Sequence, residues 1–173
     1  MLRKIQHWIY FVSIALVVVF VSILPIDAPF RTIGGPDFML TIAITWSLKR
    51  PDLLPVFLIG VTFLFLDLML HRPPGLFSMV VVAASLFAAY RHPDFREAVF
   101  AAEWLFAAAL ILGVFLVYRV LIFFTLLSAP VLTVYLSQAV FSVLLYPVIV
   151  FLGRNIWNAP SEFSAEEQPK GKR

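Results

Sequence analysis

The 173-residue chain contains no cysteine and few charged residues. The absence of cysteine excludes a disulfide framework and any metal or thiol chemistry that needs a cysteine side chain. Charged residues make up only 13% of the chain, against about 25% in ordinary soluble domains. The 13 Lys and Arg residues are spread thinly and form no basic face. The pI of about 9.5 therefore does not indicate a nucleic-acid-binding protein.

Sequence motifs of common enzymes are also missing. The chain contains no G-x-S-x-G and no H-E-x-x-H. The three histidines, His7, His71 and His92, lie in separate segments and on both expected sides of the membrane, so they cannot share a metal ion. Asp67 is the only carboxylate well inside an apolar segment, whereas an aspartyl dyad needs two. We therefore predict that the protein is not an enzyme and has no catalytic, cofactor-binding or metal site.

The residues that are abundant indicate an integral membrane protein. Hydrophobic residues make up 62% of the chain, 18 residues are Phe, and the mean hydropathy is +0.97. A helix that crosses the hydrocarbon layer needs about 20 apolar residues. On this scale we predict a single all-α domain of six transmembrane helices over residues 1–157, with short loops and a flexible polar tail over residues 158–173. The six segments are His7–Leu24, Pro36–Leu48, Leu53–Leu70, Gly75–Tyr90, Ala98–Leu127 and Pro130–Leu152.

The basic residues predict the orientation of these segments. Cytoplasmic loops of membrane proteins carry an excess of Lys and Arg. Ten of the 13 basic residues flank the segments on one side, two lie on the other, and Arg119 falls inside the fifth segment. We therefore expect both termini in the cytoplasm, and we expect the first segment to be a retained span, since no signal-peptide cleavage site follows it. The ten are Arg3, Lys4, Lys49, Arg50, Arg91, Arg96, Arg154, Lys170, Lys172 and Arg173, and the two are Arg31 and Arg72.

The second segment, Pro36–Leu48, is too short to span a membrane comfortably, because its 13 residues give only about 20 Å of helix. It is also the least lipophilic segment. Two interpretations remain open: the segment is shielded from lipid inside the bundle, or it is re-entrant. The charges of Lys49 and Arg50 after it favour a crossing helix. Its hydroxyl side chains are Thr41, Thr45 and Ser47.

Ionisable side chains inside apolar segments are costly and are therefore candidates for function. Asp67 and Arg119 are both expected in the outer third of the membrane, and His71 lies one helical turn beyond Asp67. With Asp37, they form a predicted polar cluster at the outer side, which either binds a ligand or relays protons, or contains an Asp67–Arg119 pair that only fixes two helices together. Glu103, at the cytoplasmic edge, is interpreted as an ordinary interfacial charge.

From the second segment to the fourth, the chain resembles the bacterial rod shape-determining protein MreD family. The resemblance covers about 55 residues and rests on a Pro-Asp start to a short apolar span, a Trp near its end, and a Gly…Leu-Asp…Gly pattern after it. The loop His71-Arg72-Pro73-Pro74 departs from the smaller polar residues expected there. The matching positions are Pro36, Asp37, Trp46, Pro51, Gly60, Asp67 and Gly75.

The resemblance implies a non-enzymatic scaffold in the bacterial cytoplasmic (inner) membrane. Proteins of this family accompany the single-span protein MreC, the actin-like MreB, the polymerase RodA and its partner transpeptidase in the cell-elongation machinery. The implied role is to position or regulate lateral peptidoglycan synthesis, with an MreC-like protein as the expected partner. An alternative is the substrate-binding membrane component of a vitamin-type transporter, which is similar in size and in having six spans; the outer polar cluster would then be its ligand pocket.

Overall fold

The structure, a computed structural model, describes residues 2–23, 34–95, 99–125 and 131–157. Within these ranges the chain forms six α-helices and no strand. Each helix coincides with one of the apolar segments, so the prediction of an all-helical protein is confirmed. The predicted tail, residues 158–173, lies outside the described residues. The helices are α1 (Leu2–Ile23), α2 (Phe38–Lys49), α3 (Val56–Met69), α4 (Leu76–Phe95), α5 (Phe100–Phe124) and α6 (Leu132–Trp157).

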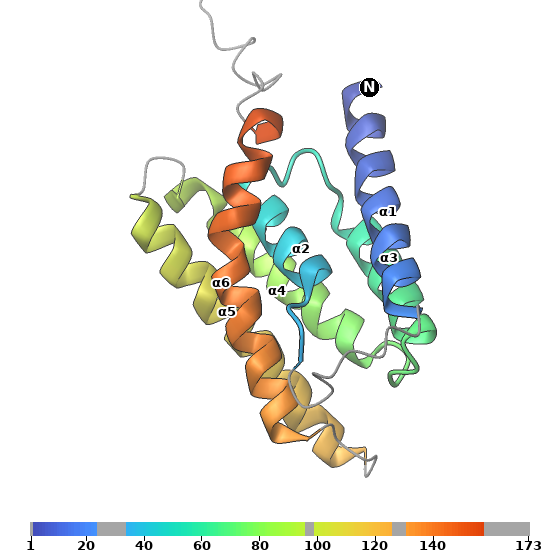
Figure 1. Ribbon diagram of the computed structural model, residues 1–173. Coiled ribbons are helices and arrows are strands. Elements are labelled where there is room, and N and C mark those ends of the chain that lie inside the picture. Colours follow the sequence, from blue (N-terminus) through green and yellow to red (C-terminus); the bar gives the residue numbers. More distant parts are fainter. Residues whose placement is uncertain (1, 24–33, 96–98, 126–130, 158–173) are drawn as a thin grey trace, which may run out of the picture.

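Successive helices run in alternating directions, so that the start of α1 and the end of α6 lie at the same end of the bundle (Figure 1). We call this end the Lys49 end, because α2 finishes there. The opposite end, where α2 begins, is called the Asp37 end. The described cations Lys49, Arg50 and Arg91 belong to the Lys49 end, whereas Arg72 follows α3 at the Asp37 end.

Three of the described helices are long and apolar enough to cross a membrane: α4, α5 and the Leu132–Gly153 part of α6. The other three, α1 to α3, include shorter apolar stretches of 12 to 17 residues. The molecule therefore has the character of a helical membrane protein by length and composition.

Helix α2 lies at the centre of the bundle and is packed between α4, α6, α5 and α1 (Figure 1). Nine of its 12 residues are buried, including the hydroxyl-bearing residues Thr41, Thr45 and Ser47. The structure therefore supports the interpretation in which neighbouring helices shield the second segment. Because neighbouring helices surround it, α2 does not need a lipophilic surface, and each threonine can donate its hydroxyl to the helix backbone. Thr41 donates to the carbonyl of Asp37 at 2.9 Å, and Thr45 to that of Thr41 at 2.6 Å.

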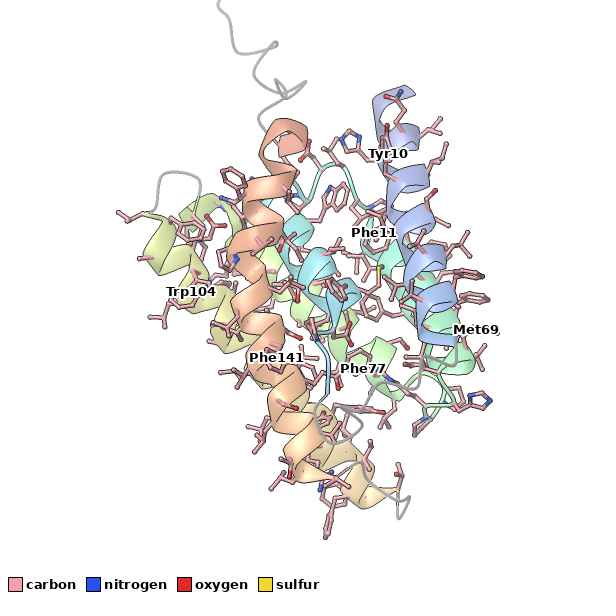
Figure 2. All side chains as sticks on the ribbon, in the orientation of Figure 1. Tyr10, Phe11, Met69, Phe77, Trp104 and Phe141 are labelled. Atoms are coloured by element: carbon pink, nitrogen blue, oxygen red, sulfur yellow. The ribbon has the colours of Figure 1, made fainter. Side chains whose placement is uncertain are left out.

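Aromatic side chains fill much of the core between the helices. Phe77 of α4 lies at the centre of a chain of rings, 6.0 Å from Phe63 of α3 and 5.0 Å from Tyr118 of α5, measured between ring centroids. In Figure 2, Phe11 and Phe77 are buried, whereas Tyr10, Met69 and Phe141 belong to the exposed apolar surface. An exposed surface of this kind is normal where lipid replaces water as the solvent.

The boundary of α4 differs from the prediction. The helix continues to Phe95, five residues beyond the expected end at Tyr90. The extension contains several charged or polar residues and is held by polar contacts as well as by packing. Arg91 pairs with Asp94 at 2.9 Å, and His92 Nδ1 donates to the carbonyl of Leu48 at 2.6 Å. The Phe95 ring stacks on that of Phe106, with 4.7 Å between the ring centroids. Hydropathy alone could not detect this last turn.

Candidate functional site: polar contacts at the ends of a buried helix

The start of α2 is fixed by hydrogen bonds to its own first turn and to α6. Asp37 is the N-cap, and its Oδ1 accepts the backbone N–H of Leu40 at 3.0 Å, which satisfies one of the unpaired donors of the first turn. The backbone N–H of Asp37 donates to Ser142 Oγ of α6 at 2.8 Å, and that of Gly34 donates to Ser137 Oγ at 2.9 Å. A Cβ atom on Gly34 would lie 2.4 Å from the carbonyl oxygen of Val134. The segment before α2 is therefore pressed directly against the α6 backbone.

The end of α3 brings Arg72 to Asp37. His71 adopts a left-handed conformation, with φ of 54°, and the N–H of Arg72 bonds to the carbonyl of Asp67 at 2.9 Å. This is the Schellman arrangement, in which Gly is the usual residue at the position that His71 occupies. Arg72 then lies with its Nη2 3.7 Å from Asp37 Oδ2 and its guanidinium 4.6 Å from the centre of the Phe77 ring. In the sequence, Arg72 is visible only as a charge in an outer loop.

Asp67 is completely buried and stabilises the start of α4. Its Oδ2 accepts the backbone N–H of Ser78, the third residue of α4, at 3.1 Å. The N-terminus of a helix carries a partial positive charge and unpaired N–H groups, so it is a suitable partner for a buried carboxylate. The nearby cation that acts on Asp67 is Arg72.

The predicted cluster of Asp37, Asp67, His71 and Arg119 is therefore only partly brought together. The ion pair among the described residues at this end joins Asp37 to Arg72, and does not join Asp67 to Arg119. Arg119 of α5 lies with its guanidinium 5.9 Å from the centre of the Tyr135 ring of α6. The side chain of His71 is exposed, and its contribution to this end is its backbone conformation. The predicted pair does not form because the two carboxylates have other partners. Asp67 is bonded to the N-terminus of α4, and Asp37 is paired with the loop residue Arg72. Neither partner is a charged residue inside an apolar segment.

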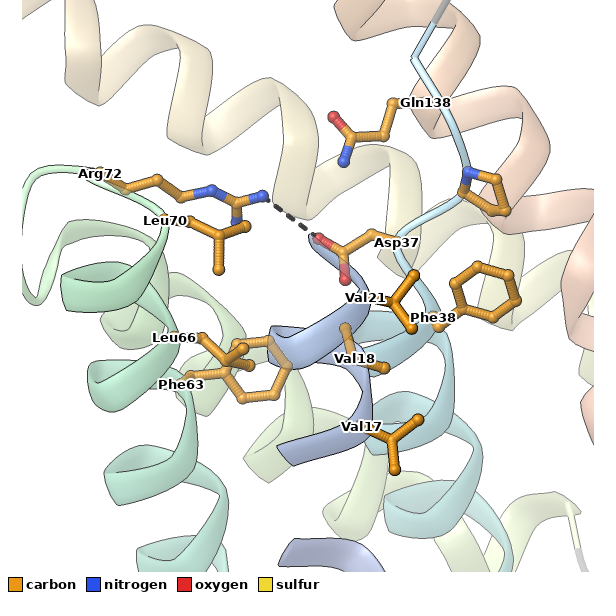
Figure 3. A pocket seen from close by; sticks show the side chains of 11 residues that line it. Val17, Val18, Val21, Asp37, Phe38, Phe63, Leu66, Leu70, Arg72 and Gln138 are labelled. Atoms are coloured by element: carbon orange, nitrogen blue, oxygen red, sulfur yellow. Dashed lines mark ion pairs between the residues drawn. The ribbon is translucent and has the colours of Figure 1, made fainter. Parts of the chain in front are cut away.

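A cavity of about 420 Å³ opens beside the Asp37–Arg72 pair (Figure 3). Its polar side chains are those of Asp37, Arg72 and Gln138, which Figure 3 shows on one side of the cavity, with apolar side chains such as Val17 and Phe63 on the other. The side chains of Arg72 and Asp37 are 23% and 11% exposed, so the pair is half-buried. The volume lies in the range of small-molecule sites, about 300–1,000 Å³. Its remaining walls are Val18 and Val21 of α1, Phe38 of α2 with Pro36 just before it, and Leu66 of α3 with Leu70 just after its end.

At the Lys49 end, a second buried carboxylate joins three helices. Glu103 of α5 is 2% exposed. Its Oε2 lies 2.5 Å from Lys49 Nζ at the end of α2, and its Oε1 accepts a hydrogen bond from the hydroxyl of Tyr146 of α6 at 2.6 Å. The interpretation of Glu103 as an ordinary interfacial charge was wrong. The available signal for this contact was a carboxylate followed directly by Trp104 in the first turn of a long apolar helix. Its two partners could not be identified from the sequence, because they lie 54 and 43 residues away.

The remaining positions of the resemblance also lie at contacts or turns. Trp46 is buried, with its ring 6.1 Å from that of Phe11. Gly60 of α3 faces Val82 of α4, since an added Cβ would lie 3.3 Å from a methyl carbon of Val82. Pro51 begins the turn after α2, and Gly75 has a φ of +86° just before α4. The seven positions are thus concentrated on α2 and on the places where α3 and α4 begin, end or touch.

Comparison with known proteins identifies no family: no protein-family model matches the chain, and no curated protein or solved structure is significantly similar to it.

Proposed function

We propose that the protein is a non-enzymatic scaffold of the bacterial cell-elongation machinery, similar to MreD, and that it lies in the cytoplasmic membrane with six spans and both termini in the cytoplasm. Its expected partner is an MreC-like single-span protein, with MreB, RodA and the elongation transpeptidase as further components of the assembly. It would help to position or regulate lateral peptidoglycan synthesis.

The observation that supports this proposal best is the structural role of the motif positions. Asp37 caps α2, Asp67 accepts a hydrogen bond from the start of α4, and Trp46 packs in the core. These residues hold helices together rather than surround a common reaction centre. A motif of this kind is what a scaffold requires, because a scaffold must present its helix faces in a fixed arrangement.

The exposed surface agrees with contacts made by helix faces. The loops between α2 and α3 and between α3 and α4 have six residues each. Large apolar side chains are exposed on every described helix, with Phe57 of α3 82% exposed and Phe123 of α5 77% exposed. A partner with one membrane span can bind such a surface without a soluble domain on this chain.

The proposal is tested by depleting the protein in the rod-shaped bacterium that produces it and by purifying it from cross-linked membranes. We expect the cells to become round and an MreC-like protein to be recovered. As a control, re-expression of the wild-type chain should restore the rods. Cells that remain rod-shaped after depletion, together with a preparation that contains no MreC-like protein, would contradict the proposal.

The cavity at the Asp37 end favours one second candidate, the substrate-binding component of a vitamin-type transporter. This candidate requires a water-soluble ligand to co-purify with the protein, and an ATPase module to be recovered with it. Measurement of vitamin uptake in the depleted cells separates the two functions, because a scaffold leaves uptake unchanged.

A further inference from the structure

The cavity beside Asp37 is one of two cavities that lie between α1 and α6 along α2, and we call the two together the crevice. A second cavity, of about 240 Å³, lies nearer to the Lys49 end and is also lined by α1, α2 and α6. The two cavities share one face of α2, because Phe38 lines the first, and Ile42 and Trp46 line the second. Residues four apart lie on the same side of a helix. From Phe38 to Trp46 this face extends about 12 Å along the helix axis. The other residues of the second cavity are Tyr10 and Ile14 of α1 and Ile149, Leu152 and Gly153 of α6.

The crevice has apolar walls that the protein itself does not cover. Val17 and Val21 of α1 are 60% and 52% exposed, and Phe38 of α2 is 46% exposed. The second cavity is lined almost entirely by apolar side chains. A hydrocarbon chain fits these walls, whereas a water-soluble ligand would leave most of them without a complementary surface.

One end of the same crevice carries a positive and a negative group that still have bonding capacity. At 3.7 Å, the contact between Arg72 and Asp37 is an ion pair but is longer than a hydrogen bond. The Arg72 guanidinium also lies over the face of Phe77, which takes up none of the N–H donors in the guanidinium plane. Asp37 uses Oδ1 for the cap of α2, so Oδ2 is the oxygen that faces Arg72 and the cavity. Gln138 adds an amide to the same side (Figure 3).

From this arrangement we propose that the crevice binds a zwitterionic phospholipid with a primary ammonium group, such as phosphatidylethanolamine. The phosphate lies against Arg72, whose planar guanidinium matches phosphate oxygens in a bidentate manner. The ammonium donates to Asp37 Oδ2 and to the Gln138 amide oxygen. One acyl chain extends along α2 between α1 and α6. The bound lipid thus replaces a long ion pair by two charge-assisted contacts.

The presence of both charges decides the lipid class. Arg72 alone would favour any lipid phosphate, including that of anionic phosphatidylglycerol. Asp37 disfavours an anionic headgroup and favours one with N–H donors, which the quaternary ammonium of phosphatidylcholine lacks. The site is therefore expected to distinguish three lipids that have the same acyl chains.

The test is native mass spectrometry of the purified full-length protein, titrated with phosphatidylethanolamine, phosphatidylglycerol and phosphatidylcholine of identical chains. We expect the wild-type protein to retain phosphatidylethanolamine about tenfold better than either of the other two, which is the effect of roughly one charge-assisted hydrogen bond. Glycerophosphoethanolamine, which has the headgroup and no acyl chains, should not compete. If it competes as well as the lipid, the site takes a soluble ligand and the proposal is wrong.

Two conservative variants separate the headgroup contacts. Arg72→Gln should weaken retention of phosphatidylethanolamine and of phosphatidylglycerol alike, because both have a phosphate. Asp37→Asn should abolish the preference for phosphatidylethanolamine over phosphatidylglycerol, while its amide oxygen still caps α2. Arg119→Gln, which removes a positive charge at the same end of the bundle, is the matched control and should leave the preference unchanged.

A third variant tests the acyl-chain path. Val21→Trp fills the cavity from an exposed position on α1 and should reduce lipid retention several-fold, whereas Phe57→Trp on the exposed face of α3 should not. Equal lipid preferences in the wild type, Arg72→Gln and Asp37→Asn would overturn the proposal. A transmembrane helix of a partner cross-linked to Val21 and Phe38, with no lipid retained, would also overturn it. Since the assay uses the isolated protein, its outcome is independent of the proposed role in cell shape.

Discussion

Two buried carboxylates hold opposite ends of the bundle by different means. At the Asp37 end, Asp67 accepts an N–H group from the start of α4. At the Lys49 end, Glu103 accepts hydrogen bonds from two other helices, one from Lys49 of α2 and one from Tyr146 of α6. Each carboxylate has only a small exposed surface, so the loss of either one leaves donors without a partner in an environment that contains little water.

The role of Asp67 predicts a graded response to substitution. Asp67→Ala should lower the free energy of unfolding by about 1–2 kcal/mol, the usual cost of losing a helix cap. Asp67→Asn should cost less, because its amide oxygen can still accept the Ser78 N–H. Unfolding in detergent micelles with increasing sodium dodecyl sulfate measures both. Adding Arg119→Ala to Asp67→Ala should not restore stability; a recovery would mean that these two residues form a direct pair.

The contacts of Glu103 predict a larger loss. Glu103→Ala should destabilise the protein by about 2–4 kcal/mol, because it leaves the Lys49 ammonium and the Tyr146 hydroxyl unpaired. Tyr146→Phe removes one hydrogen bond and should cost about 1 kcal/mol. Asp94→Ala is the control, since its side chain is 55% exposed and its loss should change stability by less than about 0.5 kcal/mol. The same unfolding assay applies, and equal losses for Glu103→Ala and Asp94→Ala would show that the buried contacts contribute nothing.

The depth of Asp67 could be predicted from the sequence, but its partners could not. Its distance from the start of an apolar segment gives its depth along the helix. Its hydrogen-bond donor is a backbone group, which has no signature in the sequence, and its nearby cation, Arg72, reaches the site only because His71 adopts a left-handed conformation. Arg119 was therefore predicted as the partner of Asp67, because it is the only basic residue inside a predicted span.

At the scale of elements, the short helix α2 depends on the segment that leads into it. Gly34 lies directly on the α6 backbone, and Ser137 and Ser142 of α6 accept the N–H groups of Gly34 and Asp37. A side chain at position 34 would separate α2 from α6. The helix and its entry segment thus form one packing unit.

Two adjacent glycines offer a matched test of this packing. Gly34→Ala should destabilise the protein by about 1–3 kcal/mol, because its Cβ would lie 2.4 Å from a backbone oxygen that cannot move alone. Gly35→Ala places its Cβ with nothing within 4 Å, so it should be neutral or slightly stabilising, by up to about 1 kcal/mol. Thermal unfolding in detergent compares the two. Equal effects would mean that the entry segment does not pack closely on α6.

The elements themselves were largely predictable, because a run of apolar residues at helical length is a strong signal in a membrane protein. The burial of α2 was also predictable from Thr41, Thr45 and Ser47, since hydroxyl groups are poorly suited to lipid. The end of α4 was not, because its last turn contains Arg91, His92 and Asp94 and is held by contacts to other residues.

At the scale of the whole molecule, the helices surround α2, with the basic residues of the described loops and helix ends concentrated at the Lys49 end. Which helix occupies the centre could not be read from the order of the segments, because alternating helices of similar hydropathy can be packed in several ways. The wide separation of α1 from α6 across α2, visible in Figure 1, had no signal in the sequence.

The proposed orientation makes a direct prediction. Reporter fusions after Arg173 and within the loop at Arg72 should be active in opposite compartments, with the carboxyl-terminal fusion in the cytoplasm. Alkaline phosphatase and green fluorescent protein fusions give complementary readings at each position. A carboxyl-terminal fusion that is active outside the cytoplasm would overturn both the orientation and the even number of spans.

The unequal helix lengths have a consequence for the surrounding bilayer. Helix α3, with 14 residues, is about 21 Å long, whereas α5, with 25 residues, is about 38 Å long. Both expose large apolar side chains. In the proposed six-span arrangement, lipids beside α3 would therefore adapt to a thinner hydrocarbon layer than lipids beside α5, at an elastic cost that grows with the mismatch. We expect the bilayer to be thinned locally beside α3, on one side of the protein, rather than uniformly around it.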